Sequence, residues 1–164
     1  MKEIQNVLCV VAHPDDVEMM AGGAMLKWKK EGKKIHVLIF TDGSWYTPEG
    51  VFLRDPVETK KDVERVAAFM GYDSCEILDE KNTHLEYSDR LVCEVLNRIS
   101  KYNIDTIYNL AALLSAVAER KPLLAWDIQM NGLLNILEIA REKHCAVFTP
   151  SSIGSFGPST PRDK

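Results

Sequence analysis

The stretch that decides the fold is VLCVVAHPDDVEMMAGGAMLKWKKEGKKIHVLIF, residues 7–40. It begins and ends with continuous apolar runs, Val7–Val11 and Ile35–Phe40, which are typical of strands buried on both faces of a sheet. Between the two runs, Asp16 can cap a helix that ends at Gly32 and carries lysines in its last turns. The stretch therefore predicts a strand–helix–strand unit of a parallel sheet.

The rest of the chain continues this alternation after a long irregular loop at residues 41–55. The expected elements are a helix over 55–71, a strand near 76–78, a helix from Ser88, a strand at 106–110, a helix over 122–143 and a strand at 145–149. This pattern predicts an α/β fold, a single Rossmann-like three-layer α/β/α domain over residues 1–164. We expect a five-stranded parallel sheet of order 3-2-1-4-5, with ligands at the carboxyl ends of the first and fourth strands.

Composition excludes several classes of protein. Hydrophobic residues make up 46% of the 164 residues and the net charge is −4, so a basic nucleic-acid-binding face is not expected. The four cysteines lie far apart without CxxC pairing, which argues against a structural zinc cluster or a disulfide framework. No apolar stretch is long enough to span a membrane, and the N-terminus leads straight into a strand. We therefore expect a cytoplasmic protein.

The first strand is followed by Ala12-His13-Pro14-Asp15-Asp16, and Gly22-Gly23 follows in the next helix. Imidazole and carboxylate groups are zinc ligands, and His13 and Asp16 lie three apart across a tight turn, so both can face one ion. Asp15 can then accept a proton from a metal-bound water. The competing interpretation is that the two aspartates cap the helix and His13 is a turn residue.

This motif and its glycine pair resemble the LmbE/PIG-L-type N-deacetylases, zinc hydrolases that act on N-acetylglucosamine-like conjugates. The resemblance covers residues 1–104 approximately, and Thr41-Asp42-Gly43 also fits it. It implies that His13 and Asp16 are zinc ligands and that Asp15 is the general base.

The resemblance also implies a third ligand, a histidine from the loop after the fourth strand. Here that loop begins Leu110–Ser115, which contains neither histidine nor carboxylate. His36 and His144 are expected at the opposite edge of the sheet, and His84 follows the third strand off to one side. We therefore expect a two-ligand remnant that binds zinc weakly or not at all.

From Asp105 onward the sequence resembles a different family, the NAD-dependent epimerase/dehydratase branch of the short-chain dehydrogenases. Three ordered segments carry this resemblance, at residues 108–112, 131–138 and 150–157, and the tail at 156–162 is similar to L-threonine dehydrogenases. By position, the resemblance implies that Ser152 is the catalytic serine of that family.

Hydride transfer in that family also needs a Tyr-x-x-x-Lys pair, which does not occur after Ser152 in this sequence. Dinucleotide binding needs a glycine-rich first turn, where this chain has Asp15 and Asp16, which would repel pyrophosphate. NAD binding is therefore not expected. The competing interpretation of Ala111, Ala112 and Gly132 is that small residues allow close packing.

These observations predict a chimera of a deacetylase-like fragment (1–104) and a dehydrogenase-like fragment (105–164), joined near residues 102–107. We expect a scaffold, engineered or selected for folding, without a complete active site. The alternatives are a residual zinc-dependent N-deacetylase acting on N-acetylated amino sugars, and nucleotide binding without hydride transfer. An uncovered strand at the sheet edge would favour self-association.

Overall fold

The structure is a computed structural model that describes residues 3–47, 49–82, 85–111 and 119–150. Its main sheet has five parallel strands in the order β5-β2-β1-β6-β7. The strands are β1 (Asn6–Val11), β2 (Lys34–Thr41), β5 (Ser74–Glu80), β6 (Thr106–Asn109) and β7 (Ala146–Phe148). Numbered along the chain, these five strands have the expected order 3-2-1-4-5, and the Rossmann-like α/β fold is confirmed.

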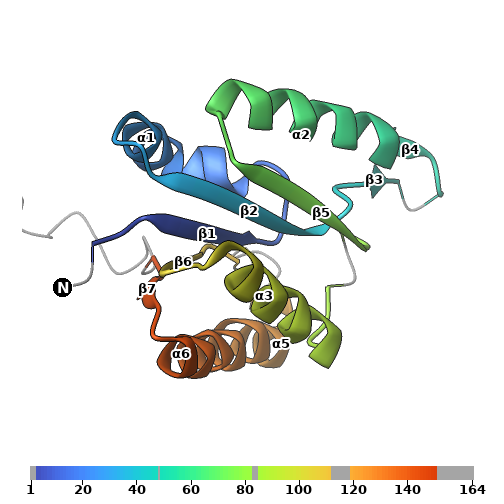
Figure 1. Ribbon diagram of the computed structural model, residues 1–164. Coiled ribbons are helices and arrows are strands. Elements are labelled where there is room, and N and C mark those ends of the chain that lie inside the picture. Colours follow the sequence, from blue (N-terminus) through green and yellow to red (C-terminus); the bar gives the residue numbers. More distant parts are fainter. Residues whose placement is uncertain (1–2, 48, 83–84, 112–118, 151–164) are drawn as a thin grey trace, which may run out of the picture.

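Helices cover both faces of this sheet, as Figure 1 shows. One face carries α1 (Asp16–Lys30) and α2 (Pro56–Met70), and the other carries α3 (Asp89–Tyr102) and α6 (Gly132–Lys143). The central strand β1 supplies both cores, because alternate residues of a strand point to opposite faces. Val7, Cys9 and Val11 pack towards α1, while Leu8 and Val10 pack towards α3 and α6.

Local sequence signals set several helix ends as expected. The Asp55 carboxylate accepts hydrogen bonds from the Val57 and Glu58 amides, Pro56 begins α2, and Gly71 ends it with φ of 70°. Ser88 caps α3 through the Leu91 amide. None of the helices in the described part of the chain combines the length and apolarity needed to cross a membrane.

The structure corrects three expectations. The segment 41–55 contains a short antiparallel pair, β3 (Trp45–Tyr46) and β4 (Phe52–Arg54), because pairs this short leave no periodic pattern in the sequence. Asp16 does not cap α1: Asp15 stands at the cap position and makes no side-chain cap hydrogen bond. The expected helix over 122–143 consists of α5 (Pro122–Trp126), a π-helical turn η1 (Asp127–Asn131) and α6.

Asp105, directly before β6, connects three strands across the expected join. Its buried carboxylate accepts the amide hydrogens of Gln5 and Asn6 at 2.9 and 3.0 Å. Its own amide donates to the Asn6 carbonyl at 3.0 Å, and its carbonyl accepts from the Ala146 amide at 2.8 Å. One residue thereby aligns the starts of β1, β6 and β7.

Replacing Asp105 with alanine should therefore destabilise the whole sheet. The Gln5 and Asn6 amides would lose a charged acceptor, a loss of about 3 kcal/mol in the free energy of unfolding. Urea unfolding followed by circular dichroism measures it. The control is Asp62→Ala on α2, whose carboxylate pairs with Arg65 at the surface, and it should change stability by less than about 0.5 kcal/mol. Equal stability of the two variants would contradict this role for Asp105.

Asp73 makes a similar connection between α1 and β2. Its Oδ2 accepts from Lys29 Nζ at 2.6 Å and from the Ile35 amide at 2.9 Å. Burial raises the pKa of this carboxyl, but the hydrogen bonds from Lys29 and Ile35 outweigh burial and lower the pKa below its ordinary value of 3.8.

A lowered folded-state pKa means that the Asp73 carboxylate stabilises the fold above pH 3.8 and that this contribution is lost as the pH falls through the folded value. Asp73→Asn should therefore be less stable than the wild type at neutral pH. The difference should shrink as the pH falls below 3.8. Urea unfolding of both proteins over a pH series measures this difference in the free energy of unfolding. A difference that stays constant to strongly acidic pH would contradict the stabilising role of the Asp73 carboxylate.

Candidate functional site

The candidate site lies in the turn from β1 to α1, at the carboxyl edge of the sheet. The Asp16 Oδ2 atom accepts the His13 backbone amide hydrogen at 2.9 Å and lies 3.6 Å from His13 Nδ1. Asp16 thus folds back over the turn instead of capping the helix, and it holds its carboxylate beside the imidazole. Asp15 is exposed at the same turn. The structure thus places His13, Asp15 and Asp16 in one turn, and neither aspartate makes a side-chain capping hydrogen bond to α1.

The His13 ring is half-buried and polarised by its neighbours. The Asp16 carboxylate beside the ring is the largest influence and raises the pKa of His13. Burial opposes this, while the charge of Asp15 and a hydrogen bond with the Asn82 side chain add to it. Asn82 follows β5, so the ends of two strands that are not neighbours in the sheet meet at this ring. Sequence reasoning did not identify Asn82, because no motif marks it.

The loop after β2 supports the same turn. Thr41 is fully buried and donates both its amide and its hydroxyl hydrogen to the Ala12 carbonyl, at 3.1 and 2.8 Å. Asp42 accepts from the Ser44 hydroxyl at 2.7 Å and from Lys81 Nζ at 2.7 Å. Burial raises the pKa of Asp42, but the hydrogen bonds from Lys81 and Ser44 outweigh it and lower the pKa. Asp42 is therefore an ionised group fixed at the strand ends.

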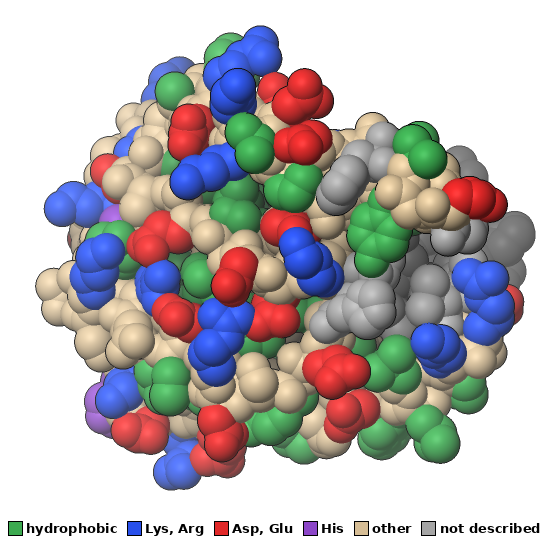
Figure 2. Space-filling view, turned by 90° about the vertical axis from the view of Figure 1, so that its right-hand side faces the viewer, with side chains coloured by type: hydrophobic (Ala, Val, Ile, Leu, Met, Phe, Trp, Pro, Cys, Tyr) green, Lys and Arg blue, Asp and Glu red, His purple; other side chains and the backbone are tan. Residues whose placement is uncertain are grey.

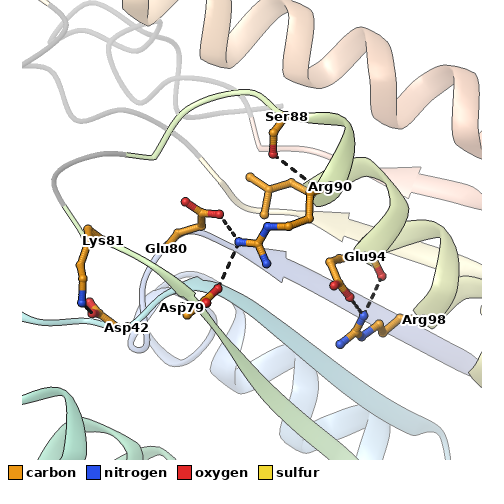
Figure 3. A network of polar contacts seen from close by, with 9 residues as sticks. Asp42, Asp79, Glu80, Lys81, Ser88, Arg90, Glu94 and Arg98 are labelled. Atoms are coloured by element: carbon orange, nitrogen blue, oxygen red, sulfur yellow. Dashed lines mark hydrogen bonds and ion pairs between the residues drawn. The ribbon is translucent and has the colours of Figure 1, made fainter.

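Figure 3 shows that charged side chains continue along the end of β5. Arg90 of α3 pairs with both Glu80 and Asp79, while Lys81 turns towards Asp42. Each carboxylate in this row has a cationic partner. The row therefore consists of ion pairs that join the end of β5 to α3 and to Asp42.

The described residues supply only part of a zinc site. His36 lies in β2, where its ring stacks on the Tyr102 ring with centroids 4.0 Å apart and its Nδ1 is hydrogen-bonded to Ser74 Oγ at 2.8 Å. His144 is the residue that caps the end of α6. Both were expected at the opposite edge of the sheet, and that is where they lie. The other histidine considered, His84, lies outside the described residues, as does Ser152.

Within ranges 3–47, 49–82, 85–111 and 119–150, no group of three or more His, Cys, Asp or Glu side chains could hold a metal ion. His13 and Asp16 provide two donors of suitable chemistry, and catalytic zinc sites use three protein ligands. The donors described do not by themselves fit a catalytic zinc ion.

An apolar pocket opens on the other face of the sheet, between α3 and the π turn. It encloses about 760 Å³, including space open to solvent. Asn109 and Asn135 contribute polar groups, and His13, Asp15 and Asp16 are not among the described residues that line it. The apolar part of the lining includes Val10, Phe40, Leu91, Val92, Val95 and Ile136. The pocket and the His13 turn are therefore separate features of the same edge.

This geometry defines a Rossmann-like α/β domain with a histidine–aspartate turn after its first strand. The chain belongs to the family described as GlcNAc-PI de-N-acetylase (PIG-L), whose sequence profile matches residues 8–117. In agreement with that membership, it resembles the N,N'-diacetylchitobiose deacetylase of Pyrococcus horikoshii in fold, with a TM-score of 0.58 and 23% identity. That likeness covers 65% of this chain and 40% of the deacetylase.

A second set of relatives carries different names. An uncharacterized epimerase/dehydratase of Staphylococcus saprophyticus is 58% identical over 64 residues, which are 39% of this chain and 20% of that protein. The L-threonine dehydrogenase of Clostridium difficile superposes with a TM-score of 0.56 at 29% identity, over 98% of this chain and 40% of that chain. This chain thus spans about a fifth of the curated relative and two fifths of the dehydrogenase.

The support of the turn by the β2 loop can be tested at Gly43. This residue has φ of 64°, and an added Cβ would lie 2.7 Å from Pro14 Cγ and 2.7 Å from Thr59 Cγ2. Gly43→Ala should therefore lower the free energy of unfolding by about 1–3 kcal/mol and displace the His13–Asp16 turn. Chemical denaturation measures the loss, and the His13 ring signals in NMR report the displacement.

Gly23→Ala in α1 is the matched control, because an added Cβ meets nothing within 4 Å there. It should stabilise the protein by about 0.5–1 kcal/mol, since glycine is a poor residue inside a helix. If Gly43→Ala were as stable as Gly23→Ala, the Gly43–Pro14 contact would not constrain the turn.

Proposed function

We propose that the chain is a chimeric Rossmann-like scaffold that retains a zinc-dependent N-deacetylase site only in part. The observation that carries this proposal is the turn after β1. There Asp16 Oδ2 lies 3.6 Å from His13 Nδ1, and Asp15 is exposed in the same turn. Family membership supports the assignment of this turn to de-N-acetylase chemistry. In that assignment His13 and Asp16 are the zinc ligands, and Asp15 is the general base.

The proposal that the site is partial rests on the number of donors. Two protein ligands leave a zinc ion dependent on water for the rest of its coordination shell, and affinity falls with each protein ligand lost. Asp42 already has Lys81 and Ser44 as partners, so a move towards the His13 turn would break existing hydrogen bonds. We therefore propose weak zinc binding and no turnover of N-acetylated amino sugars.

The proposed join lies near residues 102–107, between a deacetylase-like part (1–104) and a dehydrogenase-like part (105–164). Two kinds of relatives motivate this division, a de-N-acetylase profile and curated epimerase/dehydratases, although the profile match, residues 8–117, continues past the proposed join. The hydrogen bonds of Asp105 explain how such a join could be tolerated. They align β1 of the first part with β6 and β7 of the second.

The second candidate function is a residual zinc-dependent N-deacetylase, with a third ligand from a residue outside those described. The closeness of His13 to Asp16 favours it, because this geometry is already suited to one ion. Nucleotide binding has less support, since Asp15 is exposed where a dinucleotide pyrophosphate would approach the start of α1. We propose that NAD does not bind.

Zinc titration of the metal-free protein separates the two candidates. If the site is partial, calorimetric titration with zinc at neutral pH should show no tight one-to-one binding. The zinc affinity of His13→Ala should then equal that of the wild type. In excess zinc, the wild type should release acetate from N-acetylglucosamine conjugates no faster than Asp15→Ala does. Asp62→Ala, a surface variant of α2, serves as the control for loss of a carboxylate.

The opposite result has a definite meaning. Tight stoichiometric binding that is lost in His13→Ala, together with acetate release that is lost in Asp15→Ala but kept in Asp62→Ala, would overturn the scaffold proposal. It would establish the residual N-deacetylase instead.

A further inference from the structure

The pocket between α3 and the π turn reaches from the surface to the core of the sheet. Its floor is Val10 of β1, which is 1% exposed, and its walls include Leu91 and Val95 of α3 and Ile136 of α6. The space of about 760 Å³, solvent at the open mouth included, lies within the range of pockets that hold small organic molecules. Apolar walls of this kind favour a hydrocarbon or aromatic group over water.

The mouth of the pocket is acidic. Asp127 and Glu86 are exposed carboxylates among its lining residues, and none of the described residues that line it is a lysine or an arginine. The ion pairs formed within the described part of the chain involve neither of these two carboxylates. Asp127 accepts a hydrogen bond from the Asn131 side chain, which is a neutral partner. The negative charge at the mouth is therefore not neutralised by a cationic side chain.

A smaller hollow continues the mouth. It is lined by Tyr87, Asp127, Asn131, Leu134 and Asn135, and the first, second and last of these also line the main pocket. Tyr87 is 60% exposed. A carboxylate, amide oxygens and an exposed aromatic ring are groups that attract a protonated amine.

The π turn positions these groups. Asp127 and Asn131 are its first and last residues, and Gly132 and Asn135 follow in α6 on the lining of the same pocket. Figure 2 faces the carboxyl ends of the strands, and its lower part, where Figure 1 places α3 and α6, shows acidic and hydrophobic side chains next to one another. Since π turns are rare and recur at functional sites, the turn supports a binding role for this end of the helical segment.

We propose that the pocket binds an amphipathic organic cation, with its apolar group between α3 and α6 and its protonated amine at Asp127. The apolar walls supply affinity, and the carboxylates select the charge. An anion with the same apolar group would meet Asp127 and Glu86 without a cationic partner, which is unfavourable. The proposal does not depend on the zinc assignment, because His13, Asp15 and Asp16 are not among the described residues that line the pocket.

Three probes of similar shape and different charge test the proposal on the full chain: phenethylamine, phenethyl alcohol and hydrocinnamate. NMR titration of the isotope-labelled protein should show that the amine perturbs the amides of Val10, Val95 and Ile136. At low salt the affinity should fall about fivefold from the amine to the alcohol, and about fivefold again from the alcohol to the acid, because mainly the charge changes. AMP, an aromatic anion, should not bind.

Asp127→Asn removes the charge and keeps the shape of the side chain. It should lower the affinity for phenethylamine about fivefold and leave the affinity for phenethyl alcohol unchanged. Asp62→Asn is the matched control, since the Asp62 carboxylate lies at the surface of α2 and pairs with Arg65. It should change neither affinity.

Gly132→Leu tests the pocket itself. A Cβ added at Gly132 meets no atom within 4 Å, and the residue has a helical φ of −58°, so a leucine is accommodated and occupies space at the lining. Binding of both the amine and the alcohol should be lost. Gly23→Leu is the matched control at an equally open position of α1, and it should bind both probes like the wild type.

The proposal is overturned by equal affinities for the three probes, by an affinity for phenethylamine that Asp127→Asn leaves unchanged, or by binding that persists in Gly132→Leu. Tighter binding of AMP than of phenethylamine would show that the pocket prefers an anion and would refute it as well. Circular dichroism of each variant checks that it is folded. If Gly132→Leu proves unfolded, the charge series and Asp127→Asn still decide the proposal.

Discussion

The architecture depends on a buried carboxylate at the start of β6. Asp105 accepts two amide hydrogens from the start of β1, pairs with the Asn6 carbonyl through its own amide, and receives the Ala146 amide of β7. Buried backbone amides need partners, and an ionised acceptor satisfies them more strongly than a neutral one. The relative position of three strands is thereby fixed at one edge, and the candidate site forms at the other edge of the same strands.

The candidate site illustrates how one side chain can be used structurally and chemically. Asp16 closes the turn after β1 through the His13 amide, and the same oxygen lies near the His13 ring. The ring also meets Asn82, while Gly43 leaves room for Pro14. The turn is thus shaped by residues at the ends of three strands, β1, β2 and β5. Family membership and a preserved turn are therefore compatible with a scaffold that has no turnover.

The chain resembles two kinds of protein, the PIG-L de-N-acetylases over residues 8–117 and epimerase/dehydratases over 64 residues. The first part of the chain carries the His13 turn, and the second part carries β6, α5, α6 and β7. In the second part, described residues line an apolar pocket to which Asn109, Asp127 and Asn135 contribute polar groups.

The sequence by itself determined the strand order, most helix ends and the three residues of the β1 turn. Continuous apolar runs, a capping aspartate before Pro56 and a glycine after Met70 are local signals with local causes, and they survive without knowledge of the fold. Only the tertiary structure decided that Asp16 closes its turn, that Asn82 reaches His13, that Asp105 connects three strands and that a π turn interrupts the last long helix. These features join residues distant in the chain or depend on a single extra residue in a helix, and hydrophobic periodicity carries no information about either.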